Sequence, residues 1–272
     1  MIDANTSLFA VLGHPVSHSM SPLMHNRALM DTGFNGVYLA FDVQDIGSAV
    51  SGMRTLGING ASITIPHKVS IVPFLDQLDE TAEKIGAVNT VINRQGVLTG
   101  YNSDGLGAVK ALADKTPITD KDVVIIGAGG SARAIGFEIK SKGGRVTILN
   151  RSADKGEKLA RELGSDFQPL SNFKNVQCQI LINATPVGMT PRTDAMPVKR
   201  EDLEKSMVVM DIVYNPLNTR LLKGAVDAGC EIVDGVSMFV YQGAFQFELW
   251  TGRKAPIEVM RQVVLKALKE NS

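Results

Sequence analysis

The chain has 272 residues, of which 44% are hydrophobic and 21% are charged, a balance typical of globular proteins. Its 28 basic side chains equal its 28 acidic ones, so no net field favours nucleic acid or an anionic membrane as a partner. No apolar run reaches bilayer-spanning length, and the first residues lack the pattern of a signal peptide, so we expect a cytoplasmic protein without a membrane partner.

Short apolar runs alternate with helical patterns along the chain, an order that predicts an α/β fold with parallel sheets. In the first hundred residues, strands are predicted at 7–12, 37–43, 61–65 and 88–93, and helices at 22–32 and 45–56. Ser21 and Pro22 are the expected N-cap and first-turn pair of the first helix, and Gly33 is its expected stop.

The pattern restarts after a predicted helix at 104–115 and a polar loop at 116–121. Strands then follow at 123–126, 146–149, 180–183, 208–213 and 231–233, and helices at 131–142, 155–163, 219–228, 237–250 and 256–269. We therefore expect two domains with a catalytic cleft between them. The first is 1–103, completed by C-terminal helices within 237–272, and the second is 104–236.

A glycine-rich turn separates the predicted strand 123–126 from the helix that follows. The spacing Gly127-x-Gly129-x-x-Ala132 fits the dinucleotide-binding fingerprint, in which glycines let backbone N–H groups approach a pyrophosphate at a helix N-terminus. A structural turn could carry the same glycines. The cofactor-binding residues predicted here are Gly127, Ala128, Gly129, Gly130, Ser131 and Ala132.

The residues after the next predicted strand indicate which dinucleotide binds. An NAD site usually has an acidic side chain here to accept from the ribose hydroxyls. This chain instead has Asn150, Arg151 and Ser152, with Lys155 close by. A guanidinium pairs bidentately with a 2′-phosphate, so the segment predicts NADP. The alternative is that Arg151 is an ordinary solvated residue at a strand end.

Four segments of the first hundred or so residues, 13–22, 64–68, 87–90 and 100–104, gather hydroxyl, amide and charged side chains. They fall at strand ends and in loops, where α/β proteins bind ligands. An enzyme that transfers a hydride to or from a dinucleotide also needs a side chain that exchanges a proton with the substrate oxygen. These four segments contain side chains of that kind.

These segments resemble the motifs of the shikimate dehydrogenase family, in that family's order and spacing. The motifs are His18-Ser19-Met20-Ser21-Pro22, Thr64-Ile65-Pro66-His67-Lys68, Gly86-Ala87-Val88-Asn89-Thr90, Asn102-Ser103-Asp104, Asp234-Gly235 and Tyr241-Gln242-Gly243-Ala244, beside the two cofactor segments. The resemblance implies a substrate domain, a Rossmann-like NADP-binding domain, and reversible NADPH-dependent reduction of 3-dehydroshikimate to shikimate in chorismate and aromatic amino-acid biosynthesis. The expected partner is this small-molecule substrate, and the protein is expected to be a monomer or homodimer.

By resemblance, Lys68 and Asp104 are the catalytic pair, and a lysine ammonium beside a carboxylate can pass a proton to a nascent alkoxide. The substrate-binding residues implied are Ser17, Ser19, Thr64, Lys68, Asn89, Asp104, Tyr214 and Gln242. Ile212 and Gly235 match positions near the nicotinamide, and Glu80 is a further cofactor candidate. Without the resemblance, Lys68 would be a surface lysine and Asp104 a helix N-cap.

Two positions depart from the family pattern. Ser62 stands where asparagine is common, and Ser103 where threonine is common before the catalytic aspartate. Both replacements are small and polar, so they bear on substrate preference more than on the chemistry. A relative that also accepts quinate remains an alternative.

Other functions fit the residues less well. His14, His18, His25 and His67 have no metal-ligand spacing, and the two cysteines are too few to help, so we expect no metal. Another two-domain NADP dehydrogenase with a catalytic lysine, such as one acting on folates, is disfavoured by the paired serines and Gln242. A non-catalytic NADP-binding sensor is disfavoured by the presence of both Lys68 and Asp104.

Overall fold

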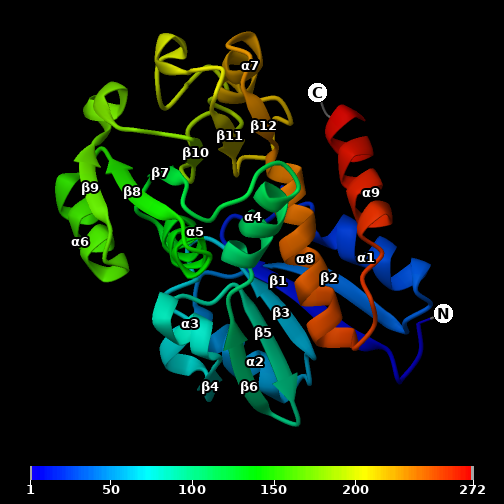
Figure 1. Ribbon diagram of the computed structural model, residues 1–272. Coiled ribbons are helices and arrows are strands. Elements are labelled where there is room, and N and C mark those ends of the chain that lie inside the picture. The colour runs from blue at the N-terminus through cyan, green and yellow to red at the C-terminus, as the bar shows by residue number, and fades with distance from the viewer. Residues whose placement is uncertain (1, 271–272) are drawn as a thin grey trace. The chain divides into compact units, whose positions relative to one another are not determined.

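The computed structural model describes residues 2–270, which form two compact units (Figure 1). The first unit extends to Ser103 and includes Gln242–Ala267. The second unit is Asp104–Tyr241, together with residues 268–270.

The first unit is built on a six-stranded sheet in the order β2-β1-β3-β5-β6-β4. The strands are β1 (Ser7–Gly13), β2 (Gly36–Asp42), β3 (Gly60–Ile63), β4 (Gln77–Leu78), β5 (Thr90–Arg94) and β6 (Val97–Tyr101). β1 pairs in parallel with β2 and β3. β5 is antiparallel to both of its neighbours, β3 and β6.

Parallel pairing was predicted for this unit; it holds for β1 with β2 and β3, but not for β5, which is antiparallel to both neighbours. β5 and β6 form a hairpin whose two turn residues, Gln95 and Gly96, have φ of 55° and 87°. Two left-handed residues make the tight turn that matches the twist of a hairpin. β6 was not predicted, because a glutamine occupies the turn position where asparagine or aspartate would have been the signal.

Helices α1 (Ser21–Asp31), α2 (Ile46–Thr55), α3 (Glu80–Ile85) and α9 (Ile257–Glu270) accompany this sheet, as does α8 (Gly235–Thr251) from Gln242 onward. The predicted N-cap of α1 is wrong: the capping residue is Met20, and Ser21 is already helical. The hydroxyl of Ser19 instead accepts from the Ser21 N–H at 3.2 Å. Gly33 follows the helix with φ of 63°, as its role as a stop predicts.

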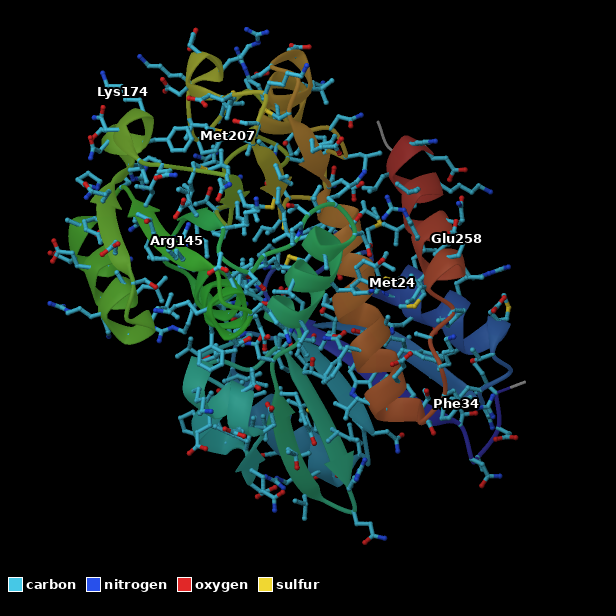
Figure 2. All side chains as sticks on the ribbon, in the orientation of Figure 1. Met24, Phe34, Arg145, Lys174, Met207 and Glu258 are labelled. Carbon is cyan, nitrogen blue, oxygen red and sulfur yellow. The ribbon has the colours of Figure 1, made fainter. Side chains whose placement is uncertain are left out.

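Aromatic packing joins α8 to the sheet of the first unit. The Trp250 ring stacks on Phe9 at 5.3 Å, and its Nε1 donates to the carbonyl of Val91 at 3.0 Å. Gly60 lies beneath the indole, where an added Cβ would be 2.3 Å from Nε1. Close contact recurs at Gly243, whose added Cβ would be 2.2 Å from the methyl group of Met24, labelled on α1 in Figure 2.

The second unit has a fully parallel sheet in the order β12-β11-β10-β7-β8-β9. Its strands are β7 (Asp122–Ile126), β8 (Arg145–Asn150), β9 (Asp166–Pro169), β10 (Ile180–Asn183), β11 (Val208–Asp211) and β12 (Glu231–Val233). This is the doubly wound order of dinucleotide-binding domains, in which the strand order reverses between the first and fourth strands, here β7 and β10.

Both faces of this sheet are buried. Along β7, Val123 and Ile125 belong to one hydrophobic cluster, whereas Val124 and Ile126 belong to another. A strand covered on both faces reads as a continuous apolar run, which explains why β7, β8, β10 and β11 were predicted. β9 is partly exposed and contains polar residues and a proline, so it gave no such signal.

The helices of the second unit are α4 (Asp104–Ala113), α5 (Gly130–Ser141), α6 (Ala153–Leu163) and α7 (Arg220–Asp227). α6 lies alongside β8 and β9 (Figure 1). α4 and α5 approach so closely that a Cβ on Gly105 would be 2.4 Å from the carbonyl oxygen of Ala134. Within residues 2–270, no helix combines the length and apolar character needed to cross a membrane.

We expect Gly60→Ala to lower the free energy of unfolding by about 1–3 kcal/mol, because the added methyl group overpacks the rigid indole of Trp250. Denaturant unfolding measures the change. Gly52→Ala is the matched control: it lies within α2 and a Cβ there meets nothing within 4 Å, so it should raise stability by roughly 0.5–1 kcal/mol. Equal effects of the two substitutions would contradict the packing argument.

Candidate active site

The glycine turn after β7 has the geometry of a pyrophosphate site. Gly127 has φ of +120°, and a Cβ there would be 3.0 Å from the carbonyl oxygen of Ala184 at the end of β10. Gly129 is the capping residue of α5, and no atom lies within 4 Å of the position of its missing Cβ. A ligand can therefore approach the backbone at the N-terminus of α5, which carries unpaired N–H groups and a positive partial charge.

The other residues of the glycine turn pack α5 against the sheet and contact Asp104, one of the two predicted catalytic residues. Ala132 is fully buried, as expected of the third fingerprint position, where helix meets strand. Ala128 and Gly130 are half-buried. The hydroxyl of Ser131 donates to Oδ2 of Asp104 at 3.4 Å, so the structure brings the turn and Asp104 together within the second unit.

A second cationic feature lies at the end of β8. Arg151, Ser152 and Lys155 are all exposed there, and Ser152 caps α6 without a hydrogen bond from its side chain to the helix. The Asn150 side chain donates to the carbonyl of Ser152 at 2.9 Å and so shapes the turn. Exposed cations, a hydroxyl and a helix N-terminus together suit a dianionic phosphate.

A buried polar network, missed by the sequence analysis, occupies the ends of β10 and β11. Asp211 is fully buried. Its Oδ2 accepts from the hydroxyl of Thr219 at 2.7 Å, and its Oδ1 accepts from the side chain of Asn183 at 3.0 Å and from the Val213 N–H at 3.1 Å. Burial raises the pKa of Asp211 to about 6. Polar residues closing two buried strands were the signal that could have revealed this network.

The network fixes the segment that carries two further candidates, Ile212 and Tyr214, and against which a third, Gly235, packs. Ile212 is half-buried, and its N–H donates to the carbonyl of Asn183 at 3.1 Å. The Tyr214 ring stacks on Phe239 of α8 at 4.7 Å. Gly235, at the start of α8, approaches the same segment so closely that a Cβ would be 2.4 Å from the carbonyl oxygen of Val213.

In the first unit, Lys68 is held by a compact turn after β3. The Thr64 N–H donates to the carbonyl of Leu12 at 3.0 Å, and the Thr64 carbonyl accepts from His67 at 2.8 Å. The Lys68 carbonyl then accepts from the Val88 N–H at 2.7 Å, while its side chain is half-buried. Backbone bonds on both sides therefore hold the lysine in place.

The two serines predicted to bind the substrate lie in the loop after β1. Ser17 is exposed and Ser19 is half-buried. β1 and β3 are neighbouring parallel strands, so the two loops leave the same edge of the sheet. The His14 N–H donates to the Ile65 carbonyl at 2.9 Å and ties the serine loop to the Lys68 turn.

Asn89 gathers several predicted residues around one amide. Its Oδ1 accepts from the backbone N–H of Ser103 at 2.8 Å, and its Nδ2 donates to Oγ of Ser103 at 2.9 Å and to Oε1 of Gln242 at 3.4 Å. Asn89 and Ser103 are buried. Because Asp104 directly follows Ser103, this amide fixes the backbone from which the predicted catalytic carboxylate extends.

Glu80 is not gathered with these groups. It lies on the surface in the first turn of α3, where its carboxylate pairs with Lys84. Among residues 2–270, no group of three or more His, Cys, Asp or Glu side chains could hold a metal ion.

Comparison with known proteins identifies the family. The model described as "Shikimate dehydrogenase substrate binding domain" matches residues 11–91, and "Shikimate / quinate 5-dehydrogenase" matches 110–220. A third, "Shikimate 5'-dehydrogenase C-terminal domain", matches 235–265. The chain belongs to the shikimate dehydrogenase family. The resemblance found in its motifs is thereby confirmed.

Individual members of the family agree over nearly the full length. The NADP(+) shikimate dehydrogenase of Methanococcus maripaludis strain C6 is 46% identical, covering 97% of this chain and 98% of its own. A solved shikimate dehydrogenase in complex with NADP+ is 43% identical with a TM-score of 0.95, covering 98% of both chains. The enzyme from Thermus thermophilus, solved with NADP(H) and shikimate, is 35% identical with a TM-score of 0.91, covering 96% and 100%.

We expect the buried Asp211 to make this family member less stable as pH rises from about 4 to 6. The folded protein keeps the proton up to a pKa of about 6, whereas the ordinary value is 3.8, so the folded state binds more protons in this range and loses stability as they dissociate. The loss should be roughly 2–3 kcal/mol. Asp211→Asn should remove it, as measured by denaturant unfolding at several pH values.

Asp122→Asn is the control for this measurement. Arg145, labelled in Figure 2, binds Asp122 at 2.7 Å and lowers the pKa of that carboxyl below its ordinary value. Its contribution to stability falls away below pH 4, so the decline between pH 4 and 6 should persist in this variant. An unchanged decline in Asp211→Asn would show that Asp211 does not titrate there.

Proposed function

We propose that this chain catalyses the reversible NADPH-dependent reduction of 3-dehydroshikimate to shikimate. The observation that carries the proposal is the position of Asp104. It follows Ser103, which Asn89 holds through its side chain, and its own carboxylate accepts from Ser131 in the glycine turn. Asp104 is thus next in the chain to a residue held by the predicted substrate-binding Asn89, and its side chain contacts the predicted pyrophosphate turn.

The first unit supplies most of the groups that a polyhydroxylated carboxylate needs. We assign Ser17, Ser19 and Tyr214 to the substrate carboxylate. Thr64, Asn89 and Gln242 then bind ring hydroxyls. Hydroxyl and amide groups can each donate or accept, so they distinguish positions around a ring without adding net charge.

The second unit has the donor set that NADP requires. The exposed backbone at Gly129 and the N-terminus of α5 accommodate the pyrophosphate, and Arg151, Ser152 and Lys155 accommodate the 2′-phosphate. Bound NADPH supplies the hydride. We assign Ile212, and Gly235 of α8 packed against the same segment, to the nicotinamide.

Lys68 and Asp104 carry out the proton transfer that accompanies hydride transfer. As the substrate carbonyl becomes an alkoxide, the Lys68 ammonium donates a proton to that oxygen, and Asp104 accepts a hydrogen bond and orients the reacting groups. In the oxidative direction the lysine amine takes the proton from the hydroxyl. Such transfers by positioned side chains accelerate reactions by about 10²–10⁴-fold.

We expect Lys68→Ala to lower kcat for shikimate oxidation by about a hundredfold or more, because no amine then accepts the proton from the substrate hydroxyl. Binding of shikimate should weaken much less. Steady-state kinetics and calorimetric binding separate the two effects. Lys84→Ala, which removes a surface lysine paired with Glu80, should leave both unchanged. Loss of binding with kcat intact would refute the catalytic role.

We expect Arg151→Ala to raise the KM for NADP by roughly tenfold or more, because charge-assisted hydrogen bonds to the 2′-phosphate are lost. The KM for NAD should hardly change. Arg145→Ala is the matched control: it removes an exposed arginine from the other end of β8. Equal effects of Arg151→Ala on both cofactors would contradict the phosphate assignment.

The remaining alternatives are separated by assaying shikimate and quinate with each cofactor. Comparable turnover of both substrates would indicate a quinate/shikimate dehydrogenase of broader specificity, and binding of NADP without turnover would indicate a sensor. The cytoplasmic location and the monomeric or homodimeric state stay predictions from the sequence.

A further inference from the structure

Within the first unit, a buried chain of hydrogen bonds leads from Tyr38 of β2 to Asn89. The Tyr38 hydroxyl donates to Oγ of Ser62 at 2.6 Å, and Ser62 donates to Oε1 of Gln246 at 2.8 Å. Nε2 of Gln246 donates to Oγ1 of Thr90 at 2.9 Å, and Thr90 donates to Oδ1 of Asn89 at 2.7 Å. All five side chains are buried. We call this set the Tyr38–Asn89 chain.

Two backbone groups fix the bond directions in the Tyr38–Asn89 chain: the Asn89 carbonyl sets the Gln246 amide, and the Ser103 N–H sets Oδ1 of Asn89 as the acceptor facing Thr90. Nε2 of Gln246 also donates to the Asn89 carbonyl oxygen at 3.2 Å, and a carbonyl can only accept. The orientation of the Gln246 amide is therefore set. Ser62 must then donate to Oε1, and Thr90, having accepted from Nε2, has its own proton free for Asn89.

The bonds from Thr90 and Ser103 orient the side-chain amide of Asn89. Its Oδ1 faces the Thr90 hydroxyl and the Ser103 N–H, so its Nδ2 is directed toward Gln242 and Oγ of Ser103. Gln242 and Gln246 are four residues apart in α8 and so share one helix face. One glutamine contacts the donor side of the Asn89 amide, and the other fixes its acceptor side through Thr90.

We propose that Gln246 is a positioning residue for substrate recognition, acting on Asn89 through Thr90 without touching the substrate. This inference rests on the proposed function, in which Asn89 binds a ring hydroxyl. Gln246 also compensates for the short side chain of Ser62, since its amide extends from α8 to the serine hydroxyl and onward to β5.

Gln246→Glu tests the direction of the bonds. A protonated glutamic acid can accept from Ser62 and donate to Thr90, so the Tyr38–Asn89 chain is preserved. An ionised carboxylate only accepts, so the Thr90 hydroxyl turns toward it and Asn89 loses a donor. Burial raises the pKa of a carboxyl group, which brings the change into the range of an enzyme assay.

Two titratable side chains lie close to Gln246 in the wild type, and neither changes its charge within the range of an enzyme assay. His25 of α1 is buried against the Tyr38 ring at 4.5 Å, and burial lowers its pKa to about 3. Burial raises the pKa of Tyr38 of β2 above its ordinary value. β3 presents Ser62, and β5 presents Thr90, with Asn89 directly before it. None of these side chains titrates.

We expect the shikimate KM of Gln246→Glu to be close to that of the wild type at low pH and to rise about tenfold as the carboxyl ionises, the cost of about one hydrogen bond. The KM for NADP should follow the wild type throughout. Gln246→Met, which can neither donate nor accept in this way, should raise the shikimate KM at every pH.

Asn26→Asp controls for loss of a structural amide. Asn26 bonds the backbone of Tyr38 through both side-chain atoms, at 2.7 and 2.8 Å, without contacting Asn89. It should lower stability in denaturant unfolding but leave the shikimate KM and its pH profile unchanged. A Gln246→Glu profile that matches the wild type would overturn the role of Gln246.

A spectroscopic readout separates this inference from the proposed function. The side-chain amide resonance of Asn89, assigned by its loss in Asn89→Ala, should shift with pH in Gln246→Glu but not in the wild type. This shift requires no turnover. A wild type that fails to oxidise shikimate counts against the proposed function, whereas an Asn89 resonance that does not titrate in Gln246→Glu overturns the positioning role.

Discussion

The hydrogen bond from the Ser103 backbone to the Asn89 side chain, 2.8 Å long, is the interaction on which the candidate site depends. It fixes the segment between β6 and α4, and so the point at which the chain enters the helix that begins with Asp104. The Asn89 side chain also donates to Gln242, and the backbone carbonyl of Asn89 accepts from Gln246. Since buried amides are costly when unpaired, the groups around Asn89 must all be satisfied together.

The second unit depends on a different constraint, the close approach of the ends of β7 and β10 at the point where the strand order reverses. Gly127 permits this approach because its φ of +120° and its lack of a Cβ accommodate Ala184. Beside it, Asp211 uses both carboxylate oxygens to bind Thr219, Asn183 and the backbone of Val213. The turn and this network together shape the ends of the strands, where doubly wound sheets bind their ligands.

Prediction from the sequence was most accurate where burial alone decides the structure. β7, β8, β10 and β11 were predicted because strands covered on both faces are continuous apolar runs. β9 and β6 were missed, since a partly exposed strand and a hairpin with an unusual turn residue give weak local signals. The predicted N-cap of α1 was wrong because Ser21 is already helical, and the hydroxyl that bonds the first turn belongs to Ser19, which accepts from the Ser21 N–H.

By itself, the sequence determined the family, the dinucleotide fingerprint and the cationic residues that predict NADP, because these depend on local spacing and residue type. Only the tertiary structure decided the sheet orders, the antiparallel β5, the Asp211 network and the bond between Gln246 and Asn89. Those two residues are 157 positions apart, and no local pattern encodes a contact made by packing α8 against β5. Which buried amide faces which partner follows from satisfying every donor and acceptor in the folded core.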